Sequence, residues 1–233
     1  MTIAENITVV RERMALAARR CGRDPAEVAL VAVSKTHAAE MVRQAWEAGV
    51  TMVGENYIQE ARDKIAALSD CAISWHFIGH LQSNKAKSAV DLFDLIHGVD
   101  SLKLAREIDK QAAKIGKTQP ILIQVNISGE ATKAGTTEEA ALSLVREAGR
   151  LEHLHVRGLM TMPPFFDQPE RARPYFAALR RLRDRIRAEA IAGVDVVELS
   201  MGMTGDFEVA VEEGATLVRI GTAIFGPREY KTD

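Results

Sequence analysis

Short apolar runs alternate with amphipathic segments along most of the chain. Residues 4–20 carry apolar side chains at helical spacing and predict an amphipathic helix. The run VALVAVSK (28–35) is rich in β-branched residues and predicts a buried strand. The next segment, 38–49, has the spacing of a helix that ends at a glycine. The chain therefore opens with one helix and then changes to a strand-and-helix order.

That order repeats along the rest of the chain. Further strands are predicted at 51–54, 74–79, 95–99, 120–127, 156–162, 195–200 and 216–221. The helices between them are predicted at 57–68, 84–93, 101–116, 137–149, 169–190 and 206–213. Strand then helix, eight times over, predicts a parallel sheet that closes into a TIM-like (β/α)₈ barrel with an extra N-terminal helix. A doubly wound open sheet shares this alternation and stays the structural alternative.

No linker or shift of composition divides the chain, so we expect residues 1–233 to form a single domain. The hydrophobic fraction of 47% and the charged fraction of 27% are those of an ordinary globular protein. A formal net charge of −2 argues against a nucleic-acid surface, which needs an excess of Lys and Arg. The start of the chain has no signal-peptide pattern, and no apolar run is long enough to span a membrane, so we expect a cytoplasmic protein.

Neither the cysteines nor the histidines predict a metal site. Cys21 and Cys71 form no CxxC pair, and both are expected to be reduced thiols. His76 and His80 lie at the end of a predicted strand, where residues four apart do not share a face as they do on a helix.

Polar residues and glycines follow the predicted strands, where the active sites of barrels lie. The residues at these strand ends are Lys35, Asn56, His80, Asn126, Thr161, Ser200, Gly221 and Thr222, together with the apolar Met160. Because the carboxyl ends of all eight strands of a barrel meet at one rim, we expect these residues to surround a common site.

An amine and an anion site are both predicted at this rim. Lys35 follows an apolar run, where desolvation favours the neutral, nucleophilic amine, although a strand-end lysine that reaches solvent is the alternative. Gly221 and Thr222 stand at a turn into a short helix, whose backbone amides bind anions. Ser200 and Gly202 add a hydroxyl and a flexible backbone after the seventh strand, and an ordinary glycine turn is the alternative there. An amine facing a phosphate site predicts pyridoxal 5′-phosphate (PLP) as the cofactor.

Arg219 lies on the eighth strand, two residues before Gly221, so both should face inward. If its guanidinium donates to the pyridine nitrogen of PLP, that nitrogen stays unprotonated, because arginine keeps its proton at physiological pH. The ring is then a poor electron sink, which disfavours the carbanion chemistry of most PLP enzymes. A structural salt bridge with an acidic neighbour such as Glu198 is the alternative.

Six motifs in order, VSKTH, GENYIQE, WHFIGHLQSNK, GLMTM, ELSMGMTGDFEVA and RIGTAIFG, resemble the pyridoxal phosphate homeostasis protein family. This family is also called the PLP-binding protein or proline synthetase co-transcribed family. The resemblance extends over residues 5 to 230. It implies a fold-type III PLP barrel related to the N-terminal domain of alanine racemase, without that enzyme's second, β domain.

The resemblance also assigns the cofactor-binding residues. Lys35 would hold PLP as a Schiff base, with Arg219 facing the pyridine nitrogen and Asn56 near the ring hydroxyl or ring face. The residues implied around the phosphate are Ser200, Met201, Gly202, Met203, Gly221 and Thr222. The stretch GMTGD departs from the commoner GMSxD form of the family.

Members of this family are regarded as carriers, buffers or regulators of PLP rather than as enzymes. Apo PLP-dependent enzymes are therefore possible partners, and a monomer is expected, since a closed barrel needs no partner. The alternative is a small amino-acid racemase with Lys35 as one base and Tyr57 or a water as the other. We expect the chain to be too short for the domain that supplies the second base in alanine racemase. A cofactor-free Schiff-base aldolase is a further alternative, opposed by the predicted phosphate site.

Overall fold

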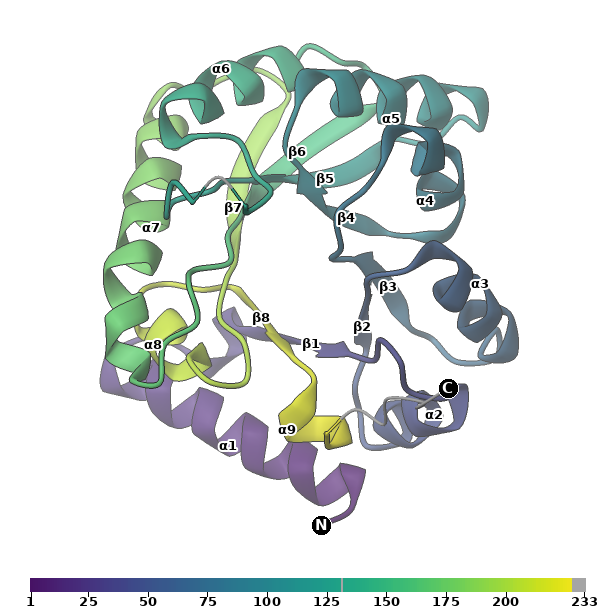
Figure 1. The fold of residues 1–233 in the computed structure, drawn as a ribbon, viewed down its shortest axis with the longest axis vertical. Helices are drawn as coiled ribbons and strands as arrows, with labels where there is room; N and C mark the ends of the chain where they lie inside the picture. Colours follow the sequence, from purple (N-terminus) through teal and green to yellow (C-terminus); the bar gives the residue numbers. More distant parts are fainter. Residues whose placement is uncertain (131, 228–233) are drawn as a thin grey trace.

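Eight parallel strands close into a barrel in the order β1 to β8, with helices around the outside (Figure 1). The computed structural model describes residues 1–130 and 132–227, so residue 131 and the last six positions of the predicted domain, 228–233, lie outside the described residues. β1 pairs with both β2 and β8, which closes the ring. This closure confirms the predicted (β/α)₈ barrel and shows that the open-sheet alternative was wrong.

The strands are β1 (Ala29–Val33), β2 (Met52–Glu55), β3 (Ser74–Phe77), β4 (Leu95–Val99), β5 (Gln119–Gln124), β6 (Leu154–Met160), β7 (Val194–Ser200) and β8 (Leu217–Ile220). The α-helices are α1 (Ile3–Arg20), α2 (Ala39–Glu47), α3 (Ile58–Ala67), α4 (Ala86–Leu92), α5 (Leu102–Lys114), α6 (Glu138–Ala148), α7 (Arg173–Ala188), α8 (Phe207–Glu212) and α9 (Thr222–Phe225). Short 3₁₀ helices are η1 (Pro25–Glu27), η2 (Ser83–Lys85) and η3 (Pro169–Ala172).

Two apolar clusters hold the barrel together. The larger one joins the outer faces of the strands to the buried faces of the helices. The smaller one consists of Val31, Leu95, Leu122, Met160 and Leu217, from five different strands. Because β1 and β5 stand on opposite sides of an eight-stranded ring, this second cluster fills the barrel interior. The barrel is therefore a packed core, and any site must lie at its rim.

The leading helix α1 is present, as predicted, and packs across the outside of the barrel over α8 and α9 (Figure 1). It begins with a capping box in which the Thr2 side chain accepts from the Glu5 N–H and the Glu5 carboxylate accepts from the Thr2 N–H. Ile7, Val10 and Met14 form its buried stripe.

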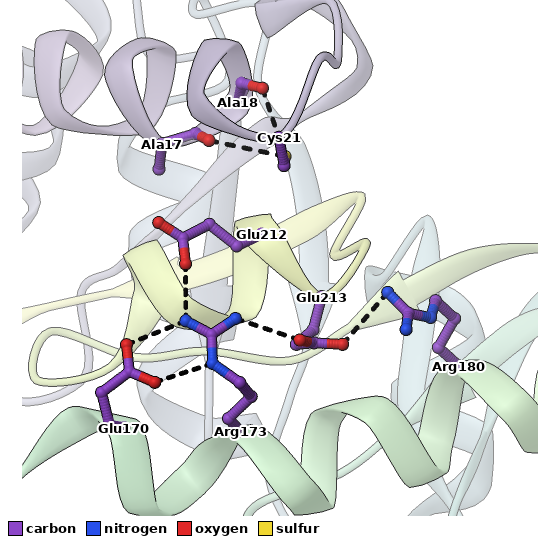
Figure 2. A network of polar contacts seen from close by, with 8 residues as sticks. All are labelled: Ala17, Ala18, Cys21, Glu170, Arg173, Arg180, Glu212 and Glu213. Carbon is purple, nitrogen blue, oxygen red and sulfur yellow. Dashed lines mark hydrogen bonds and ion pairs between the residues drawn. The ribbon is translucent and has the colours of Figure 1, made fainter.

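A network of ion pairs ties α7 to α8 on the outer layer (Figure 2). The Arg173 guanidinium donates to Glu170, Glu212 and Glu213, and Arg180 also pairs with Glu213. This network lies where the predicted helix 169–190 divides into η3 and α7. It fixes the start of α7, and η3, which precedes α7, follows the loop that borders the site described below. No helix among the described residues has both the length and the apolar character needed to cross a bilayer.

Candidate functional site

The carboxyl ends of the strands open into a cavity of about 510 Å³. Six of the predicted cofactor-binding residues line it together: Lys35, Asn56, Met203, Arg219, Gly221 and Thr222. They come from the ends of β7, β8, β1 and β2, which are consecutive in the ring. An amine, an amide, a guanidinium and a backbone turn therefore face one space.

Ser200, Met201 and Gly202 lie behind this cavity rather than on its wall. The Met201 N–H donates to the Leu217 carbonyl, and the Arg219 N–H donates to the Gly202 carbonyl, so the chain here runs beside β8. Gly202 has a φ of +90°, and a Cβ on it would come within 2.5 Å of the Ala210 side chain. The next four residues, 203–206, turn outward and line the cavity.

β1 ends at Val33, two residues earlier than predicted, because the chain turns at Lys35. Thr36 has a φ of +68°, a left-handed conformation that a β-branched residue rarely adopts. The Thr36 N–H donates to Glu60 Oε1 of α3 at 2.5 Å, and the Ser34 hydroxyl donates to the Glu55 carboxylate of β2. The backbone on both sides of Lys35 is thereby held in place.

Lys64 of α3 connects these two carboxylates. Its ammonium is buried and donates to the Ser34 carbonyl, to Glu55 and to Glu60, each at 2.6 Å. The three donors of the ammonium thus have three acceptors. Burial raises the pKa of the Glu55 carboxyl, while the neighbouring Lys64 charge opposes that rise. We name Glu55, Glu60 and Lys64 the amine-side cluster.

Arg219 lies on β8, which pairs with β1 on the side opposite β2, and 3% of its surface is exposed. One guanidinium nitrogen donates to Ser200 Oγ at 2.6 Å and another to the Thr161 carbonyl at 3.0 Å. Burial lowers the pKa of Arg219 to about 10, and the nearby Asp206 opposes this change, so the group remains a cation at neutral pH. The predicted alternative partner, Glu198, instead pairs with Arg157 of β6.

Two turns border the part of the cavity where an anion was predicted. In one turn, the Met203 N–H donates to Asp206 Oδ1 at 2.7 Å. A Cβ at Gly205 in this turn would meet no atom within 4 Å, so the backbone there is open to approach. In the other, Gly221 packs against the Val33 carbonyl, which a Cβ would approach to 3.1 Å.

Asn56 carries a buried polar atom that lacks a partner. Its Oδ1 has no hydrogen-bond partner within residues 1–130 and 132–227. Such an atom costs free energy unless a ligand or a water satisfies it.

The other residues predicted at the rim have different surroundings. His80 lines the cavity, the Thr161 hydroxyl donates to the Val125 carbonyl, and the Asn126 amide donates to the loop carbonyl of Glu130.

The sequence reasoning did not identify the apolar wall of the cavity or the amine-side cluster. The wall comes from Ile78 and from the loop 162–166, which falls between the end of the predicted strand 156–162 and the predicted helix 169–190. Its prolines and phenylalanines, PPFF, were a usable signal, because apolar residues in a loop after a barrel strand often line a ligand. The cluster residues lie in the quoted motif GENYIQE or shortly after it.

The two histidines considered for a metal site, His76 and His80, lie in different surroundings. His76 is buried inside the barrel and bonds to His97 at 3.1 Å, whereas His80 is exposed at the rim. In the part of the chain that the structure describes, no three His, Cys, Asp or Glu side chains are grouped to hold a metal ion.

The chain matches the family model for the alanine racemase N-terminal domain over residues 3–229. It is 45% identical to a pyridoxal phosphate homeostasis protein of Aquifex aeolicus over 99% of this chain and 100% of that protein. The protein of the same name in Pseudomonas aeruginosa is 46% identical over 98% of this chain and 97% of that protein.

Solved structures agree with the sequence comparison. PipY of Synechococcus elongatus, determined with PLP bound, superposes with a TM-score of 0.85 at 36% identity over 97% of this chain and 100% of that chain. Alanine racemase of Clostridium difficile superposes with a TM-score of 0.71 at 14% identity, over 96% of this chain but 57% of that chain, and so shows the fold alone. The predicted family is confirmed, and this chain belongs to the pyridoxal phosphate homeostasis proteins, whose barrel is that of the alanine racemase N-terminal domain.

Proposed function

We propose that this protein binds PLP through the amine of Lys35 and takes part in PLP homeostasis as a carrier, buffer or regulator, without a catalytic reaction of its own. The observation that carries the proposal is the single cavity that contains Lys35, Arg219 and the turn at Gly221 and Thr222. The PLP-bound structure of PipY and the name shared by the curated relatives support it.

The cavity fits the cofactor group by group. The unpartnered Oδ1 of Asn56 is an acceptor suited to a ring hydroxyl. The open backbone at Gly205 and the turn at Gly221 and Thr222 suit a phosphate. Ser200, Met201 and Gly202, predicted to border the phosphate, would act from behind this wall. When bound, PLP supplies an aldehyde that captures amines and a ring that can withdraw electrons.

Arg219 is the residue that argues against carbanion chemistry. It donates to Ser200 and to the Thr161 carbonyl on the barrel side, and it also lines the cavity. Since a guanidinium does not give up its proton at neutral pH, a ring nitrogen that accepts from it stays unprotonated. This choice of residue favours binding and release of the cofactor over turnover of amino acids.

The racemase alternative needs a second base on the other face of the cofactor. Tyr57, the residue considered for this role, is 58% exposed and is not among the residues that line the cavity. Incubation with L-alanine or L-serine, followed by chiral chromatography, tests it. Inversion at about 1 per second or faster would overturn the proposal that the protein is not an enzyme.

We further propose a cytoplasmic monomer whose residues 1–233 form one PLP-binding domain.

Reductive trapping tests the binding proposal. The purified protein is loaded with PLP, treated with borohydride and digested, and the peptides are analysed by mass spectrometry. We expect the added mass of the reduced cofactor on Lys35. Lys85 and Lys87, which lie beyond β3 and outside the cavity lining, are internal controls and should stay unmodified. Labelling spread evenly over these lysines, or absent from Lys35, would contradict the proposal.

Transfer to an apo PLP enzyme separates the homeostatic roles. The PLP-loaded protein is mixed with the apo-enzyme, and the return of enzyme activity is compared with the rate at which free cofactor leaves the loaded protein. Activation faster than release indicates a carrier. Activation that follows the release rate indicates a buffer or a regulator.

A further inference from the structure

A chain of hydrogen bonds runs from Arg219 at the cavity into the barrel interior. Arg219 bonds to Ser200 at 2.6 Å, Ser200 to His97 Nδ1 at 2.9 Å, and His97 Nε2 to His76 Nδ1 at 3.1 Å. The chain ends where His76 Nε2 meets the Ser74 hydroxyl at 3.3 Å. Its members come from β8, β7, β4 and β3. The binding function proposed above does not require the two histidines.

Only one direction of the hydrogens gives every donor along this chain an acceptor within it. A guanidinium has donors and no acceptor, so Ser200 Oγ must accept from Arg219. Among the described residues, the other side-chain partner of Ser200 is His97, so the serine hydrogen goes to His97 Nδ1. His97 then carries its own hydrogen on Nε2 and donates to His76 Nδ1. His76 in turn carries a hydrogen on Nε2 and donates to Ser74.

This direction requires both imidazoles to be neutral. A proton added to His97 Nδ1 would leave the Ser200 oxygen facing two donors and its own hydrogen without an acceptor. A proton added to His76 Nδ1 would face the Nε2–H of His97. Burial lowers the pKa of His97 well below its ordinary value, helped by His76 and Arg219, and burial lowers the pKa of His76 to about 4. The electrostatics therefore agree with the geometry.

We propose that His97, supported by His76, is a positioning residue for the cofactor site. By accepting the hydrogen of Ser200, His97 fixes the serine lone pair toward Arg219 and so holds the guanidinium at the wall of the cavity. The inference rests on the proposed function, since it is the ring of bound PLP that Arg219 would meet. Buried polar side chains are costly in a core that apolar residues could fill, which favours a role beyond packing.

The tautomers give the first test, on the unaltered protein. Long-range ¹H–¹⁵N correlation spectra distinguish imidazole protonated on Nε2 from imidazole protonated on Nδ1 and from imidazolium. In PLP-loaded protein at neutral pH we expect His97 and His76 both neutral with the hydrogen on Nε2. A hydrogen on Nδ1 of His97, in either the neutral or the charged form, would overturn the proposal.

Two substitutions of His97 give the second test. His97→Gln keeps an acceptor for Ser200 and a donor for His76, whereas His97→Phe keeps neither. We expect His97→Phe to weaken PLP binding about tenfold and to shift the absorption maximum of the bound cofactor, and His97→Gln to restore most of both. His153→Gln, at a half-buried turn position just before β6 and away from the cavity, is the matched control and should change neither.

The design separates the two proposals. If the unaltered protein develops no band with PLP, the proposed function fails. If it binds PLP but His97→Phe folds and gives the same affinity and absorption maximum, the positioning role fails while the binding function stands. If His97→Phe does not fold, the tautomers of the unaltered protein still decide the proposal.

Discussion

The two sides of the cavity are held in different ways. Lys35 stands on a turn that is fixed by charged groups, the Glu55 and Glu60 carboxylates and the Lys64 ammonium. Arg219 is held by neutral acceptors, the Ser200 hydroxyl and the Thr161 carbonyl. The contacts around Lys35 therefore position a backbone turn, whereas the contacts of Arg219 orient a side chain.

The difference follows from the two side chains. Lysine has a flexible stem, so its reach is set by the position of its Cα, and the bonds around Lys35 are to the backbone of its neighbours. Arginine has a planar fork of donors, and fixing two of those donors fixes the orientation of the whole group. Because no carboxylate bonds directly to Arg219 among the described residues, its positive charge stays available to the cavity.

The largest expected effect comes from removal of the amine itself. Lys35→Ala should abolish the absorption band of the bound cofactor, because no other predicted site residue carries a primary amine. The turn around residue 35 is held through Ser34 and Thr36, so the fold should survive, as judged by circular dichroism. A band of unchanged intensity in this variant would place the covalent contact elsewhere.

Breaking the amine-side cluster should have the next largest effect. Lys64→Met leaves two carboxylates, one of them fully buried, without their counter-charge, which should lower the free energy of unfolding by about 3–5 kcal/mol. Urea denaturation measures this loss. Lys114→Met, at the exposed end of α5, is the control and should stay within about 0.5 kcal/mol of the parent protein. A similar small change for Lys64→Met would mean that the cluster does not stabilise the turn.

On the side of Arg219, the free energy of unfolding should depend on pH, because the buried His76 is neutral in the folded protein. His76 has a folded-state pKa of about 4, against 6.5 for the free side chain, because burial disfavours its charged form. The unfolded chain therefore binds a proton first as pH falls. Stability that is present above pH 6.5 is lost progressively between pH 6.5 and about 4, by about 3 kcal/mol in total. His76→Gln should lose less stability over the same interval in urea denaturation, and equal losses in the two proteins would refute a neutral buried His76.

The fold was predictable because strand and helix periods alternate through the whole sequence, and the strand-end rule then located Lys35, Asn56 and Gly221 at one rim. The local backbone was not predictable. Periodicity extended the first strand to Lys35, but the left-handed Thr36 and the bonds from Ser34 to β2 and α3 end it at Val33. Nothing in a strand pattern indicates a positive φ at threonine.

The hydrogen-bond partners of the buried side chains could not be predicted from the sequence either. The inward direction of Arg219 followed from the period of two, yet its partners come from residues 58 and 19 positions away. His97 lies on a strand that periodicity predicted correctly, and its sequence neighbours give no hint of Ser200 or His76. Such contacts depend on the closure and the register of the barrel, which only the three-dimensional structure provides.

A crystal structure of the protein loaded with PLP tests the central claim most directly, that Lys35 and Arg219 act on one ligand. We expect electron density continuous with Lys35 Nζ, the ring nitrogen within hydrogen-bond distance of Arg219, and the phosphate at the turns of Gly205 and Gly221. A cofactor bound with its ring away from Arg219, or with its phosphate away from both turns, would contradict the account.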